Sequence, residues 1–197
     1  MSFIELPLVN PGEVIESSYN NQNKHNTDYL KVRADKVDKY IVNPLLQIQH
    51  TTPAGTPGGT FSAGAWRNRI LNTVVVNKIE GASIDEETYA IILPAGEYAF
   101  HSFATGYRVV QHVTRLYNIT DDEVLVFGSS GYSASGSADT NSHSFINHRF
   151  ELTKETILQL QHRCSNSYST HGFGAGSVDF GQEISIFAEV RVYRIGD

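Results

Sequence analysis

The sequence predicts an all-β sandwich over most of its length, and three features agree on this. Aromatic residues make up 11% of the 197 residues, and 16 glycines are spread along the chain. No stretch is dominated by Leu, Ala, Glu and Lys, the residues typical of long helices. From residue 45 onward, short apolar runs alternate with turns rich in Gly, Pro, Ser and Asn. This spacing favours packed antiparallel sheets over βαβ units.

The apolar runs after residue 44 have the length and composition of strands, and no helical pattern separates them. They cover residues 45–50, 66–76, 88–96, 97–105, 109–119, 123–129, 145–152, 155–164 and 183–195. The last run is the clearest. Its alternation predicts one apolar face, made by Ile184, Ile186, Ala188, Val190 and Val192, with Phe187, Tyr193 and Ile195 on the other. At least eight such strands are enough for a jelly roll.

Residues 1–44 have a different character. An apolar peptide is followed by the Pro11-Gly12 turn and by a polar stretch too poor in apolar residues to build a core. Residues 29–42 fit either one face of a helix or a short strand. We therefore expect an extended N-terminal arm, residues 1–44, that docks on another molecule, followed by a jelly-roll domain, residues 45–197. The predicted docking residues are Phe3, Ile4, Leu6, Leu8, Leu30, Val37, Tyr40 and Ile41.

Charge and composition exclude several classes of function. The formal net charge is -6 and only 18% of residues are charged, so we expect no nucleic-acid partner. No apolar run is long enough to cross a membrane, and we expect no membrane partner. The first 18 residues lack a basic leader and an apolar core, so we expect no secretory signal. The single cysteine, Cys164, excludes an internal disulfide and a cysteine-based zinc cluster.

Catalytic and metal-binding motifs are absent from the sequence. "GYSAS" at residues 131–135 lacks the final glycine and the strand–turn–helix setting of a nucleophile elbow. None of the eight histidines has the spacing of a helical zinc motif. Two alternatives stay open: histidines from three chains gathered on a symmetry axis, and a calcium site at residues 121–123. We expect no enzymatic activity, no cofactor and no metal.

Two loops, residues 128–144 and 165–182, combine small polar residues with isolated aromatics. They fit ordinary long connections at one end of a sandwich. They also fit a recognition surface, since the same composition occurs in antibody paratopes. The candidate recognition residues are Tyr132, Tyr168 and Phe173.

Four motifs occur in order along the domain: "GAWRNRILN" at residues 64–72, "LPAGEY" at 93–98, "HVTRLYNIT" at 112–120 and "LQLQHRCSNS" at 158–167. With the final "GFGAGSVDFGQEISIFAEVRVYRI", they resemble the C1q/TNF-like jelly roll of structural proteins in tailed bacteriophages. The resemblance covers about residues 59–195 and says nothing of the arm. It implies a homotrimer in which the last strand and its neighbours pack around a threefold axis.

Subunit packing would also explain strands with apolar residues on both faces. After the turn in "ILPAGEYAF", Tyr98 and Phe100 share one face of an extended chain, while Phe103 lies on the other. A monomeric sandwich buries only one face of such a strand. The predicted subunit contacts are Tyr98, His112, Tyr117, Phe150, Phe187, Tyr193 and Ile195. Loops packed over the outer face are the alternative.

The resemblance and the arm together predict a trimeric decoration, or cement, protein of a phage head. In this hypothesis the protein is made in the host cytoplasm and ends on the capsid surface of the virion. The arm binds the lattice of the major capsid protein, and the jelly roll projects outward. The alternatives are a receptor-binding tip of a tail fibre or baseplate that recognises host surface glycans, and a free C1q-like lectin or signalling ligand.

Overall fold

The computed structural model describes residues 21, 23–31, 44–134, 140–176 and 181–196. The chain divides into two compact units, residues 1–43 and 44–197. In the first unit, residues 23–31 are helical, and Thr27 Oγ1 donates to the Asn23 carbonyl at 2.9 Å, one helical turn back. The expected extended conformation is therefore wrong for this segment, because the polar stretch satisfies its backbone within a helix.

Of the predicted docking residues, Leu30 lies on this helix and is exposed. The remaining seven lie outside the described residues: Phe3, Ile4, Leu6, Leu8, Val37, Tyr40 and Ile41. Among the residues that the structure describes, no helix is long and apolar enough to cross a membrane.

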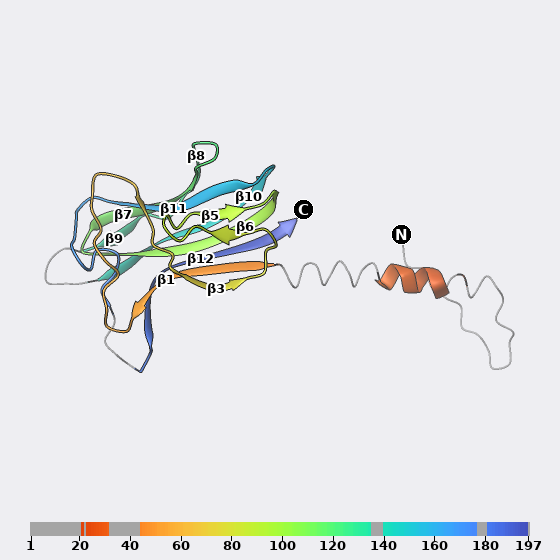
Figure 1. Ribbon diagram of the computed structural model, residues 1–197, viewed down its shortest axis with the longest axis horizontal. Coiled ribbons are helices and arrows are strands. Elements are labelled where there is room, and N and C mark those ends of the chain that lie inside the picture. Colours follow the sequence, from red (N-terminus) through yellow and green to blue (C-terminus); the bar gives the residue numbers. More distant parts are fainter. Residues whose placement is uncertain (1–20, 22, 32–43, 135–139, 177–180, 197) are drawn as a thin grey trace. The chain divides into compact units, whose positions relative to one another are not determined.

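The second unit is a jelly roll of two antiparallel sheets, which Figure 1 shows as stacked layers of strands. One sheet has the order β10 (Asn141–Leu152), β6 (Gly96–Tyr107), β12 (Ile184–Gly196), β1 (Leu45–Pro53) and β3 (Thr73–Asn77). The other has the order β4 (Ser83–Ile84), β5 (Ile91–Leu93), β11 (Thr156–Cys164), β7 (Val110–Asn118) and β8 (Glu123–Phe127). Two short strands complete this seven-stranded sheet: β2 (Arg67–Asn68) on β11 and β9 (Gly131–Ser133) on β7. Each predicted run contains a strand, so the all-β prediction is confirmed.

The main core lies between the sheets and follows the period-two pattern of the strands. Leu46 and Ile48 of β1 and Val190 and Val192 of β12 are fully buried in it, together with Leu116 of β7. Their alternation with polar residues is what turns one face of each sheet inward.

Tyr98 and Phe100 of β6 belong to this core, whereas Phe103 is half-buried on the opposite face. The Tyr98 hydroxyl donates to the Pro94 carbonyl of the Pro-Ala-Gly turn at 2.9 Å. The predicted division of β6 into two apolar faces is confirmed. The prediction that Tyr98 is a subunit contact is wrong, because this side chain is fully buried within its own chain.

A β-bulge in β12 changes which residues of this strand face inward. His50 of β1 pairs with Ala188 and Thr51 pairs with Ile186, so Phe187 is the extra residue. The alternation of inward-facing and outward-facing residues along β12 therefore shifts by one residue at this point. Phe187 is buried, while Ile184 and Ile186 are exposed. The predictions that Phe187 is an outward subunit contact and that both isoleucines face the core are wrong.

Close packing explains the glycines of "GFGAG". Gly174 has a φ of +143° and a Cβ there would lie 2.2 Å from a ring carbon of Phe187. At Gly172, a Cβ would lie 2.5 Å from the Tyr168 carbonyl oxygen. Only glycine lets this loop approach β12 and its own neighbouring turn so closely.

Candidate functional site

Aromatic and histidine side chains form a row on the outer face of the five-stranded sheet. Phe103 of β6 contacts His143 of β10 edge-on, with ring centroids 5.6 Å apart, and His143 lies 5.8 Å from Phe145. His101 contacts Tyr193 of β12 in the same edge-on manner at 5.9 Å. Phe145 is 51% exposed. We call these five residues the outer-face row.

Polar groups beside the outer-face row are already paired with one another. The Glu189 carboxylate accepts hydrogen bonds from the amides of Gln47 at 2.8 Å and Gln49 at 2.5 Å. It also pairs with Arg191 at 2.7 Å. A hollow of about 160 Å³ lies between Phe103, Phe145 and these charged groups. A face whose polar groups are satisfied internally can be covered at little desolvation cost.

The same sheet has an aliphatic end. The exposed Ile184 and Ile186 line a second hollow of about 350 Å³, which His143 also borders. The sequence prediction missed Phe103, His143 and Phe145 as contact candidates, although the parity of Phe103 was a usable signal.

Of the predicted subunit contacts, Tyr193 belongs to the outer-face row. Tyr117 lies on the other sheet, and Phe150 is half-buried against Tyr98, with ring centroids 5.8 Å apart. Ile195 is half-buried near the end of β12. As subunit contacts, these four residues stay predictions.

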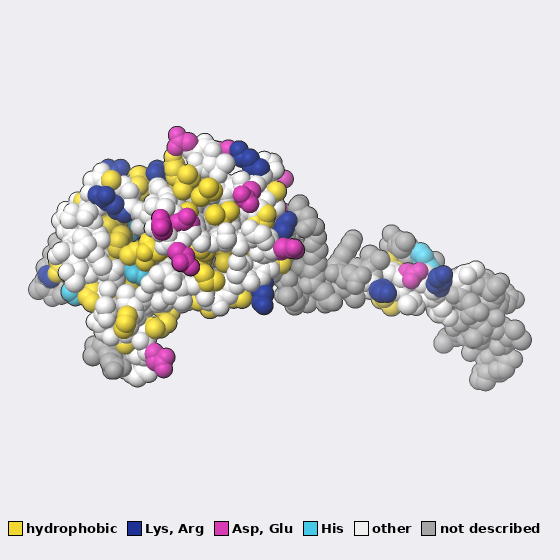
Figure 2. Space-filling view, in the orientation of Figure 1, with side chains coloured by type: hydrophobic (Ala, Val, Ile, Leu, Met, Phe, Trp, Pro, Cys, Tyr) yellow, Lys and Arg dark blue, Asp and Glu magenta, His cyan; other side chains and the backbone are white. Residues whose placement is uncertain are grey.

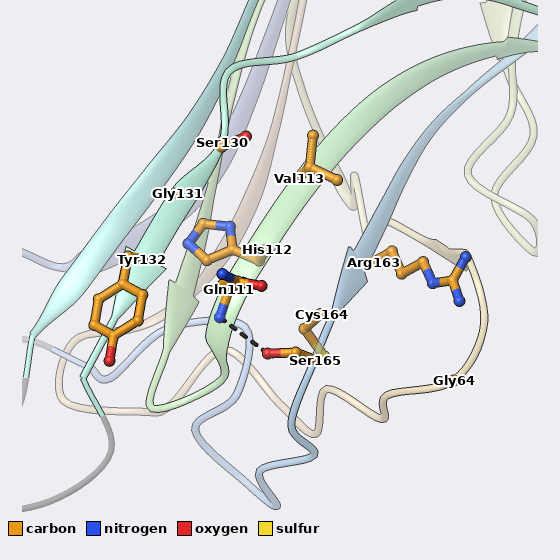
Figure 3. Close-up of a pocket in the computed structure, with 10 residues that line it drawn as sticks. All are labelled: Gly64, Gln111, His112, Val113, Ser130, Gly131, Tyr132, Arg163, Cys164 and Ser165. Carbon is orange, nitrogen blue, oxygen red and sulfur yellow. Dashed lines mark hydrogen bonds between the residues drawn. The ribbon is translucent and has the colours of Figure 1, made fainter.

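A cavity of about 700 Å³ opens where β7, β9 and β11 meet (Figure 3). Tyr132, which is 63% exposed, and Arg163 lie on opposite sides of the view, with Gln111 and Ser165 between them. The backbone N–H of Gln111 donates to Ser165 Oγ at 3.0 Å. Polar side chains around one exposed aromatic ring are typical of a small-ligand pocket.

His112 lies at the bottom of this cavity and belongs to a buried polar cluster. Its Nδ1 is 2.9 Å from Nε2 of His162, and its Nε2 is 2.7 Å from Ser142 Oγ. Gly131 packs directly on the imidazole, since a Cβ there would lie 2.4 Å from it. The prediction that His112 is a subunit contact is wrong, because these partners hold it inside one chain.

Arg69 is the cation of this cluster and is almost completely buried. Its Nη2 donates to the carbonyls of Phe173 at 2.8 Å and Phe187 at 2.9 Å, and its guanidinium lies 4.2 Å from the Phe173 ring. No described residue bonds its Nε or Nη1. Burial and, second, the charge of Arg69 lower the pKa of His112 to about 4 and that of His50 to about 3. The same causes lower the pKa of His162 well below its ordinary value.

The predicted recognition residues separate into exposed and buried ones. Tyr132 is exposed beside the cavity. Tyr168 is half-buried, and its hydroxyl accepts a hydrogen bond from Arg108 at 2.8 Å. Phe173 is buried and stacks on Phe61 with ring centroids 4.5 Å apart. The prediction that Phe173 is a recognition residue is wrong, because the loop turns this ring into a second small core with Val109 and Cys164.

Within the part of the chain that the structure describes, no three His, Cys, Asp or Glu side chains gather as a metal ion would require. Burial raises the pKa of the Cys164 thiol to about 11, which disfavours the reactive thiolate.

No protein-family model matches the sequence, and no curated protein matches it. Among solved structures, the chain is similar to the Eiger TNF of S. frugiperda, with a TM-score of 0.53 and 11% identity over 79% of this chain and 94% of that one. The globular domain of zebrafish complement 1qA also matches, with a TM-score of 0.45 and 14% identity over 78% and 98%. The likeness to Eiger shows that the second unit has the C1q/TNF-like jelly-roll fold.

Proposed function

We propose that this protein is a trimeric decoration, or cement, protein on the capsid surface of a phage, whose N-terminal arm binds the lattice of the major capsid protein. The observation that carries the proposal is the outer-face row. An apolar and aromatic sheet face with internally paired polar neighbours is suited to burial against a second copy of the same chain. The sequence motifs at residues 64–195 support the assignment to phage virions, because they resemble the jelly rolls of such structural proteins.

Different segments of the chain lie at the two ends of the jelly roll, which supports separate roles for these ends. At one end, the first residue of β1, Leu45, pairs with Tyr193 near the end of β12 (Figure 1). At the other end, Pro53 pairs with Ile184, and the loops that hold Tyr132 and Tyr168 lie there. β1, the strand that follows the arm in the sequence, therefore begins at the end opposite the two loops. In a trimer, three arms would leave from one pole and bind a lattice together, which increases avidity.

Phe145→Asp is expected to convert the trimer into a monomer. Phe145 is half exposed within one chain, so the monomer tolerates a carboxylate there, whereas an interface would bury the charge without a partner. We expect the trimer dissociation constant to rise by at least roughly a hundredfold. Light scattering should then report the mass of a single 21.8 kDa chain in place of three.

Phe127→Asp is the matched control for this experiment. Phe127 is 58% exposed, but it lies on β8 of the other sheet. This variant should stay trimeric. A monomeric native protein, or a trimer that only Phe127→Asp dissociates, would contradict the assignment of the outer-face row as the subunit contact.

Deletion of residues 1–43 is expected to leave a folded trimer that no longer binds capsid shells. Those residues form a unit separate from the jelly roll. Co-sedimentation with undecorated heads should recover the full chain and lose the truncated one. Shell binding that survives the deletion would contradict the role of the arm.

A second candidate function is favoured by the exposed Tyr132 beside the cavity of about 700 Å³. In that case the protein is a receptor-binding tip of a tail fibre or baseplate that recognises host surface glycans. The full chain would then fail to bind heads in the same assay.

A further inference from the structure

A second aromatic cluster lies on the outer face of the seven-stranded sheet, around Arg115 of β7. The Arg115 guanidinium lies 4.2 Å from the ring centroid of Trp66 and 4.5 Å from that of Tyr117. Phe127, directly opposite Arg115 on β8, lies 6.0 Å from Trp66. We call Trp66, Arg115, Tyr117 and Phe127 the Arg115 cluster.

The guanidinium in this cluster is held in one orientation. Its Nε donates to Gln161 Oε1 at 2.8 Å, and Gln161 in turn donates to Gln159 Oε1 at 3.0 Å. Both glutamines are buried under their neighbours, although they lie on the outer face of β11. No described residue accepts a hydrogen bond from either Nη of Arg115. The result is a planar, pre-oriented pair of donors, the geometry that binds a carboxylate in bidentate fashion.

A second arginine adds positive charge to the same face. Arg163 of β11 pairs with Val113, one outward position before Arg115 on β7. Burial and, less strongly, the charge of Arg163 lower the pKa of Arg115. A carboxylate that touches the cluster, Asp122, accepts its hydrogen bond from the Tyr117 hydroxyl. Two arginines therefore face outward together in a chain whose net charge is -6.

The Arg115 cluster continues into the cavity of Figure 3. Val113 and Arg163 line that cavity, and Tyr132 lies at its far side. An outward surface thus runs from Tyr132 past Arg163 to Arg115 and Phe127. Its two exposed aromatic rings, Tyr132 and Phe127, flank two arginines, of which Arg115 is held by its hydrogen bond to Gln161.

We propose that this surface binds an acidic polysaccharide whose sugar residues carry carboxylates. One sugar places its carboxylate on the Nη edge of Arg115 and its apolar ring face on Phe127. A neighbouring sugar enters the cavity, where Arg163 and Gln111 supply hydrogen bonds beside the Tyr132 ring. This ligand fits better than a nucleic acid, because two arginines in an acidic chain make no extended phosphate-binding track. The inference does not rest on the capsid-decoration proposal, and for the second candidate function it names the ligand class of the same surface.

Titration of the full-length protein with a carboxylated oligosaccharide tests the inference. The probes are an oligogalacturonate, a neutral galactose oligosaccharide of the same length, and a single-stranded DNA of equal charge, each measured by calorimetry. We expect the oligogalacturonate to bind at least roughly tenfold more tightly than the other two. Arg115→Gln should weaken the affinity for the oligogalacturonate by roughly tenfold. Arg115→Lys should weaken it nearly as much, because lysine keeps the charge but cannot form the bidentate pair of hydrogen bonds.

The control is Lys78→Gln, which removes the same charge from the loop after β3 and should leave affinity unchanged. Phe127→Ala probes the surface at an exposed position without opening the core, and it should weaken binding about fivefold. Equal binding by the native protein, Arg115→Gln and Phe127→Ala would overturn the inference. Binding of DNA or of the neutral sugar as tight as that of oligogalacturonate would overturn it as well.

Discussion

Between pH 6.5 and about 4.5, the free energy of unfolding is expected to fall by roughly 5 kcal/mol through His50 and His112 alone. Each has an ordinary pKa of 6.5, which describes the unfolded chain. In the fold, burial and then Arg69 lower the pKa to about 3 for His50 and about 4 for His112. Below pH 6.5 the unfolded chain therefore binds protons that the folded chain does not.

Each of these histidines removes about 1.4 kcal/mol of stability per pH unit until its folded pKa is reached. His162, whose pKa is lowered in the same direction, adds to the loss. Burial and, second, the charge of Arg69 also lower the pKa of His143, which contributes an effect of the same sign. Because domains are stable by about 5–15 kcal/mol, unfolding in mild acid is the expected outcome.

Urea unfolding at a series of pH values measures this loss directly. His50→Leu should lower the slope against pH by about 1.4 kcal/mol per unit, since one proton-binding group is gone. The control is Val75→Leu, at an exposed position of the edge strand β3, which removes no proton-binding group and should keep the native slope. A native protein whose stability is flat from pH 6.5 to about 4.5 would show that these histidines are not buried as neutral groups.

Arg69→Ala is expected to lower the free energy of unfolding by roughly 3–5 kcal/mol. The change leaves a cavity in place of the side chain. It also removes the donor for the carbonyls of Phe173 and Phe187, which holds the glycine-rich loop against β12. Thermal or urea unfolding at pH 7.5 measures the effect, away from the histidine titration.

Arg69→Met separates the packing of this side chain from its charge. Methionine fills much of the volume and removes the buried cation, so we expect a smaller loss, roughly 1–3 kcal/mol. The free energy of unfolding of this variant should also fall less steeply as the pH is lowered, because Arg69 no longer opposes protonation of the histidines. Arg149→Ala, at an exposed position, is the control and should change stability by less than about 0.5 kcal/mol. An Arg69→Ala variant with an unchanged free energy of unfolding would contradict the role assigned to the hydrogen bonds of Arg69.

The strands were predictable from the sequence because their patterns are local. Tyr98, Phe100 and Phe103 divide between two faces as alternation requires. The sequence pattern assigned Phe187 to the wrong face of β12. A bulge depends on the partner strand, and no residue pattern within 183–195 predicts it. A pattern of period two gives the faces of a strand only between such irregularities.

The buried polar cluster could not be predicted, because its members come from distant segments. Arg67 and Arg69 stand two residues apart in one motif, yet the first is exposed and the second buried. Only the fold brings Phe173 and Phe187 to Arg69. Arg115 was missed for the same reason, since its stacking partner Trp66 lies 49 positions earlier in the chain.

The bulge at Phe187 also couples the interior of the domain to its surface. Without the extra residue, Ile184 and Ile186 would continue the inward face that Ala188 and Val190 form, and Ser185 would turn outward. The Phe187 carbonyl accepts its hydrogen bond from Arg69, so a buried guanidinium fixes the register that exposes the two isoleucines. A substitution deep in the core would thereby alter the aliphatic end of the five-stranded sheet, and with it the surface that the proposed trimer would bury.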